Sequence, residues 1–229
     1  MNKKLINVFL GLCAVGLLFI TWRSIQDTED FDADVKAREN VVKARLMEIR
    51  SAQEAYKAQH GEYCPDWSVL IQFVKTGRLP IVMKQGVLTD KQMDAGLTES
   101  KAAEIVNSGD QAAIIANGLQ DFRRDTVWVS LKDSLYNYEG FVADSMRYIP
   151  FSEGDTFELI ACPSTTRSGT IMQVMECNAP DSAFLKGMGK QGSRIINNRA
   201  EEADAKGAYP GLKIGDIGSN WNNNAGNWE

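Results

Sequence analysis

This chain of 229 residues shows no combination of side chains whose types and spacing indicate a catalytic reaction. His60 is the only histidine, and no G-x-S-x-G sequence is present to mark a serine nucleophile. A zinc site or a Cys–His nucleophile would need further ligands or a base beside His60, and the sequence places none near it. We therefore predict no catalytic residue and no metal site, and we do not expect an enzyme.

Two short motifs have the spacing of ligand-binding loops. Residues 187–192 (GMGKQG) fit G-x-G-x-x-G, but no buried parallel strand is expected before them and too few residues follow to complete a βαβ unit. Asp30, Asp32 and Asp34 are spaced like the first ligands of a calcium loop, but Val35 and Val41 stand where Gly and Glu are required. We interpret these motifs as a glycine-rich turn and an acidic linker, and we predict no cofactor.

Two of the four cysteines, Cys162 and Cys177, flank a predicted hairpin. A two-residue loop at Gly169-Thr170 would place them opposite each other, and an oxidising compartment would then favour a disulfide. Pro163 argues against so regular a ladder. The alternative is that both cysteines, together with Cys64, are small buried apolar residues.

Residues 5–22 (LINVFLGLCAVGLLFITW) contain no charged residue. At about 1.5 Å per residue, this stretch comes close to the roughly 30 Å hydrocarbon core of a bilayer. It lacks the polar face that a helix on a soluble core would need. We predict a transmembrane signal anchor over residues 1–23, with cleavage, or lipidation at Cys13, as the alternative.

The charged residues around this stretch predict its orientation. Lys3 and Lys4 precede it, whereas an acidic run over residues 27–34 follows Arg23. Positive charge stays cytoplasmic, so we expect a single pass of the inner membrane with a periplasmic or extracellular ectodomain. Without Lys3, Lys4 and Arg23, 22 basic residues remain against 30 acidic ones, a net charge of −8. Such a surface argues against nucleic acid as a partner.

Residues 24–60 are predicted to form an amphipathic stalk helix that ends at Gly61. An apolar stripe with a seven-residue repeat runs along it, consisting of Val35, Val42, Leu46, Ile49 and Tyr56. One interpretation is that this stripe packs against the head of the same chain. The other is that it packs against copies of itself, although three heptads are short for an independent coiled coil.

The end of this helix, residues 50–63 (RSAQEAYKAQHGEY), resembles the end of the long helix in type IV pilins and type II secretion pseudopilins. There an A-x-x-x-Y…G-x-Y pattern leads into a globular head. The resemblance covers roughly the first 65 residues and implies a long N-terminal helix packed on a small antiparallel sheet. Residues 1–5 carry neither the Gly-Phe processing site nor the following glutamate of that family.

The ectodomain over residues 61–210 is predicted to be α+β. Helices are expected at 67–75, at 99–106 after Thr98, at 111–117 after Asp110, and at 193–206. Strands are expected at 79–83, 126–131, 146–151, 156–162 and 170–177. Because the last four follow one another without helices between them, we expect an antiparallel sheet.

Residues 211–229 are rich in Gly and Asn and are predicted to be a tail without a core of its own. Its Trp221 and Trp228 are candidate docking residues, and the alternative is a tail laid back on its own domain. We expect a pilin-like envelope protein that serves as a structural or assembly component of a membrane complex. Its partners would be the membrane and other envelope proteins or copies of itself. The alternatives are an anchored ligand- or cell-wall-binding domain acting alone and, less favoured, an envelope enzyme.

Overall fold

The computed structural model describes residues 3–166, 168–218 and 224–229, without the side chains of residues 3–8, 10, 24 and 25. Within this part, no helix combines the length and the apolar character needed to cross a membrane. The anchor predicted over residues 1–23 falls partly on positions and side chains outside the described part. The chain divides into two compact units, residues 1–71 with 142–229, and residues 72–141.

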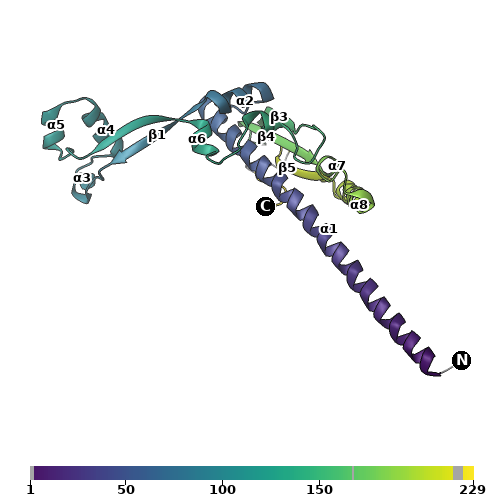
Figure 1. Cartoon of the computed structure of the whole chain (residues 1–229). Helices are drawn as coiled ribbons and strands as arrows, with labels where there is room; N and C mark the ends of the chain where they lie inside the picture. The colour runs from purple at the N-terminus through teal and green to yellow at the C-terminus, as the bar shows by residue number, and fades with distance from the viewer. Residues whose placement is uncertain (1–2, 167, 219–223) are drawn as a thin grey trace. The chain divides into compact units, whose positions relative to one another are not determined.

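The first unit is built on one long helix, α1 (Lys3–His60), which joins the predicted anchor and stalk without a break (Figure 1). No proline lies within α1, and its two glycines, Gly11 and Gly16, are in the first third. The helix ends where Gly61 adopts a positive φ of 82°, a conformation that glycine takes without strain. The predicted end of the stalk is therefore confirmed.

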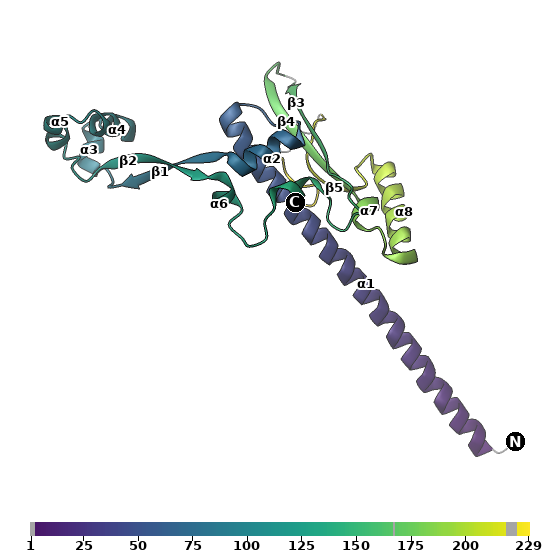
Figure 2. The ribbon, with the colours of Figure 1, turned by 45° about the horizontal axis from the view of Figure 1, so that its top comes forward.

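A three-stranded antiparallel sheet lies beside the C-terminal half of α1 (Figures 1 and 2). Its strand order is β3 (Glu158–Thr165), β4 (Ile171–Pro180) and β5 (Gly211–Gly215). The α+β class is confirmed. The strands predicted at 156–162 and 170–177 pair antiparallel as expected, whereas the strand predicted at 126–131 pairs with residues 78–85 in a separate sheet. The third strand was not expected, because residues 211–215 fall in the predicted tail, yet Leu212 and Ile214 are buried.

The apolar stripe of α1 forms the core of this unit. Val35, Val42, Leu46 and Ile49 are buried, and Tyr56 is half-buried. These side chains are enclosed by the chain's own head, which is the first of the two interpretations of the stripe. Buried Gln53 lies beside them and closes the turn after α1, because its amide donates to the Cys64 carbonyl at 2.7 Å and accepts from the Cys64 N–H at 2.9 Å.

Short helices complete the first unit. They are η1 (Ala143–Arg147), α7 (Asp181–Phe184) and α8 (Gly189–Lys206), while α2 (Trp67–Thr76) lies at the boundary between the units. The strand predicted at residues 146–151 is wrong. A 3-10 turn occupies its beginning, and only Tyr148 makes a β-bridge, to Thr156.

The second unit is a β-hairpin that carries helices. Strand β1 (Arg78–Gln85) pairs with β2 (Arg123–Ser130) in eight antiparallel pairs. Between them lie α3 (Asp90–Asp94), α4 (Glu99–Asn107) and α5 (Gln111–Ala116), and α6 (Leu131–Leu135) follows β2. A small core of Leu88, Ala102, Ile114, Leu119 and Phe122 holds the helices between the strands together. The predicted caps are confirmed, because the side chains of Thr98 and Asp110 accept first-turn N–H groups.

Candidate functional site

The only histidine lies at the end of the stalk helix. His60 is exposed at the end of α1 and stacks on Tyr56 with 4.0 Å between the ring centroids. In the described part of the chain, no group of three or more His, Cys, Asp or Glu side chains could hold a metal ion. The glycine motif spans the turn before α8 and the first residues of that helix, with positive φ at Gly187 and Gly189. The sheet strand before it, β4, is antiparallel to its neighbours, so the βαβ geometry of a dinucleotide site is missing here.

The predicted facing of Cys162 and Cys177 is wrong. Cys162 pairs with Val174, and Cys177 pairs with Leu159, so the two cysteines lie on opposite faces of the sheet. Both thiols are free. The ladder ends at the pair of Thr165 and Ile171, which makes the loop five residues long instead of two and shifts the register by three. Pro163 fits because β3 is an edge strand.

The chain's C-terminal residues lie back on the first unit. The side-chain amide of buried Asn224 donates to the Tyr63 hydroxyl at 2.6 Å, and the Asn227 amide donates to the Gly211 carbonyl at 2.8 Å. Trp228 is half-buried, and the Lys43 ammonium lies 5.8 Å from the centroid of its ring. Trp228 is therefore part of the fold, whereas Trp221 lies outside the described residues.

The N-terminal third of α1 is a first candidate site, because it exposes large apolar side chains that no other described part of the chain covers. Eight of them are at least 56 % exposed: Phe9, Leu12, Val15, Leu17, Leu18, Phe19, Ile20 and Trp22. The one hydroxyl among them is satisfied internally, since Thr21 donates to the carbonyls of Leu17 and Leu18 at 3.0 and 2.9 Å. A continuous apolar surface of this kind marks contact with lipid or with another protein.

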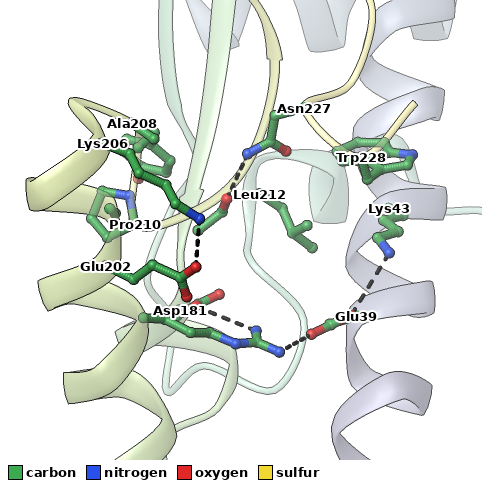
Figure 3. A pocket seen from close by; sticks show the side chains of 14 residues that line it. Glu39, Lys43, Asp181, Glu202, Lys206, Ala208, Pro210, Leu212, Asn227 and Trp228 are labelled. Carbon is green, nitrogen blue, oxygen red and sulfur yellow. Dashed lines mark hydrogen bonds and ion pairs between the residues drawn. The ribbon is translucent and has the colours of Figure 1, made fainter.

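A second candidate is the cleft between α1, α8 and the segment that carries β5 (Figure 3). The guanidinium of Arg199 on α8 lies 2.8 Å from a carboxylate oxygen of Glu39 on α1 and 3.4 Å from one of Asp181 on α7. The Lys43 ammonium lies 3.7 Å from Glu39, and Lys206 pairs with Glu202 at the rim. Arg199 thus joins three helices through two carboxylates.

A second arginine strengthens the contact between α1 and α7. Arg38 on α1 donates to the carbonyls of Phe184 and Lys186, at 2.9 and 3.0 Å, and its guanidinium lies 5.0 Å from the centroid of the Phe151 ring. Together, Arg38 and Arg199 fix the segment from α7 to α8 along the stalk part of α1.

Burial governs protonation in the cleft. It raises the pKa of Asp181 above its ordinary value, and the attraction of Arg199 offsets this effect only in part. Burial, followed by the negative charges of Glu158 and Glu176, raises the pKa of Tyr209 to about 12, so this phenol is protonated at neutral pH. Each carboxylate of the cleft lies close to a cation, and no nucleophile lies beside a base. The arrangement is suited to holding helices together.

Sequence reasoning missed Glu39, Asp181, Arg199 and Arg38. They belong to three separate elements, and each looks like an ordinary charged residue of a solvated helix face. Burial distinguishes the two carboxylates, because the side chains of Glu39 and Asp181 are only 15 % and 6 % exposed. No local spacing signals a contact between residues 39 and 199.

No protein-family model, no curated protein and no solved structure matches this chain.

Proposed function

We propose that this chain is a single-pass, pilin-like envelope protein that acts as a structural or assembly component of a membrane complex. The observation that carries the proposal is the ring of exposed apolar side chains around residues 9–22 of α1. Water would solvate these side chains at a cost of about 25 cal/mol per Å² of apolar surface. A bilayer removes that cost on every side of the helix at once.

The residues that flank this segment support the same topology. Lys3 and Lys4 lie on one side, and Trp22 and Arg23 lie on the other, where an aromatic ring and a cation suit the headgroup region. The N-terminus would be cytoplasmic, and everything from the stalk onward would be periplasmic or extracellular.

The packing of α1 supports the pilin-like part of the proposal. One continuous helix leaves residues 9–22 uncovered and lays its C-terminal half against an antiparallel sheet. The cleft contains paired charges and no reactive group, which favours a structural role. The alternative, an anchored ligand- or cell-wall-binding domain, is favoured by the open cleft itself, because Tyr209 and Trp228 contribute aromatic surface to its wall.

Alkaline carbonate extraction of membranes tests the anchor. The full chain, carrying a periplasm-active reporter after Glu229, should stay in the pellet with an active reporter. Val15→Arg with Leu18→Arg should release it, because each arginine at the centre of a span costs about 3 kcal/mol. The matched control is Val41→Arg with Met47→Arg, at positions that are 44 % and 37 % exposed on the stalk. This control should stay in the pellet, and extraction of the unaltered chain would overturn the proposal.

Photo-crosslinking separates assembly from action alone. Ala44 is exposed on the face of α1 that points away from the buried stripe, so a photoreactive side chain there can reach a neighbour. Adducts with protein in membranes support the assembly role. A chain that is retained in the membrane and forms no protein adduct there favours the lone ligand-binding alternative.

A further inference from the structure

Helix α8 lies beside α1 (Figures 1 and 2), and two contacts along it show in which direction it runs. Near its start, Gln191 lines the same hollow as Phe19, Ile20, Arg23 and Asp27 of α1. Farther along, Arg199 pairs with Glu39. Both helices therefore run the same way, and the first turns of α8 lie at the level where the apolar segment of α1 gives way to charged residues.

The first turns of α8 expose two cations, Lys190 and Arg194. They are four residues apart and so lie on one face, opposite the face that buries Gly192 and Ala203. Neither has an ion-pair partner among the residues that the structure describes, whereas the neighbouring Lys186 pairs with Glu153 at 2.8 Å. The acidic residues of α8 lie toward its other end, so both the mutual repulsion of this pair and the helix dipole disfavour the two cations.

The complementary charge is on α1. Asp27, Glu29, Asp30, Asp32 and Asp34 are all exposed, and no basic residue interrupts them. Within the described part of the chain, none of these carboxylates lies within ion-pair distance of a cation. Asp27 shares the hollow of Gln191, and the run extends about 10 Å farther along the helix. The acidic run and the two cations therefore lie at nearly the same height on α1, yet they are not paired within the chain.

We propose that the exposed face of α8 formed by Lys190 and Arg194 docks on the acidic run of α1 in a second copy of this chain. This inference rests on the proposed function, because insertion in one membrane holds two copies at the same depth and so brings the two surfaces to the same height. The contact joins different surfaces of the two copies, so the pair keeps one free surface of each kind: the acidic run of one copy and the α8 face of the other. Further copies can therefore add to form a ring or a row.

The charge of the acidic run also decides between a second copy and the membrane as the occupant. The five carboxylates of the run outnumber the three nearby cations, Arg23, Lys190 and Arg194. Anionic lipid headgroups would repel this excess negative charge, because the run lies within about two Debye lengths of the apolar segment. A second copy satisfies the cations and the carboxylates together.

The test uses the full chain in phosphatidylcholine vesicles, which present no net anionic surface. Isotope-labelled and unlabelled chains are mixed and treated with a carbodiimide, which couples a lysine amine to a carboxylate. We expect Lys190 linked to a residue of the 27–34 run in peptide pairs of mixed isotope. Links between peptides of the same isotope only would place the pairing within one chain and overturn the proposal.

Charge reversal tests the same contact by energy transfer between copies labelled through fusions after Glu229. Lys190→Glu with Arg194→Glu should weaken association by about fivefold or more, as should Asp30→Lys with Asp34→Lys. All four changes in one chain should restore it. The control, Lys101→Glu with Lys132→Glu, reverses two exposed cations of the second unit and should change nothing.

The outcomes separate this inference from the proposed function. A chain that is extracted by carbonate fails the anchor test, whatever its association. A chain that remains in the vesicles but shows no mixed-isotope link, and equal energy transfer in all variants, overturns the docking of α8 on α1 and leaves the anchor standing. Association that appears only after phosphatidylglycerol is added would assign Lys190 and Arg194 to lipid headgroups instead.

Discussion

At the scale of single residues, burial decides how much the charges of the cleft contribute to stability and to the position of α8. Arg199 bridges Glu39 and Asp181, and both carboxylates are largely removed from water. A buried ion pair is weak support for stability, because the desolvation of each charge opposes their attraction. A buried ion pair does, however, favour one arrangement of the helices over others, because an unpaired charge left in the same place costs several kcal/mol. This bridge therefore serves to define how α8 lies on α1.

The raised pKa of Asp181 predicts a pH dependence with a definite sign. Well above this pKa the carboxylate is charged in both the folded and the unfolded chain, and its burial costs stability in full. As the pH falls through the folded pKa, the folded chain takes up a proton first, so its free energy of unfolding rises. The gain is complete below about 3.8, the ordinary value for this group. Relative to Asp181→Asn, the unaltered protein should therefore become more stable over this window.

Urea unfolding at a series of pH values measures this difference. The control is Asp204→Asn, the same replacement at an exposed position of α8, which should change stability little at any pH. A constant difference between the unaltered protein and Asp181→Asn across the window would show that Asp181 is not protonated there, and that Arg199 offsets its burial completely.

At the scale of elements, α1 is one helix in two environments. It is one α-helix throughout, but residues 9–22 expose apolar side chains on every side, and its C-terminal half buries one stripe. The stability of the second region comes from this stripe, because helices in water gain more from packing an apolar face than from propensity.

Replacing one member of the stripe tests that account. Ile49→Asp should place a carboxylate in the core without a partner and lower the free energy of unfolding by about 3 kcal/mol or more. Met47→Asp, two residues away on the exposed side, should change it by less than about half a kcal/mol. Both variants place the same side chain in the same helix, so helix propensity cannot explain a difference. Equal thermal midpoints for the two variants in detergent would mean that the stalk does not pack on the head.

At the scale of the whole molecule, the chain consists of two units, and the second is inserted into the first. Residues 72–141, which begin within α2 and end just before η1, interrupt the head and carry their own small core around Leu119 and Phe122. The entrance and exit of the hairpin lie next to each other, because Arg78 pairs with Ser130 and the Leu131 N–H donates to the Gly77 carbonyl at 2.9 Å. A chain can lose such an insertion without having to bridge a gap.

We expect the first unit to survive its excision. Replacing residues 79–129 by Asn-Gly would close the hairpin with a two-residue turn directly after the pair of Arg78 and Ser130. Circular dichroism should show a cooperative thermal transition within a few degrees of that of the full chain. Loss of that transition would show that the head needs the hairpin to fold and that the two units are not independent.

Some features of this protein follow from the sequence alone because a few neighbouring residues decide them. The end of α1 at Gly61 and the N-caps Thr98 and Asp110 depend on hydrogen bonds between residues at most four apart, so the local pattern is sufficient. The buried stripe followed from its seven-residue repeat. The antiparallel pairing of β3 and β4 followed from two predicted strands with no helix between them.

Other features were decided only when distant segments met. The register of β3 and β4 depended on a loop of five residues that the sequence did not mark. The third strand, β5, forms because residues 211–215 pair with β4, although their composition is that of a tail. Glu39, Asp181 and Arg199 became a bridge only because three helices enclose them. In each case the structure depends on the free energy of burial against a segment far along the chain. Local propensity does not include this free energy.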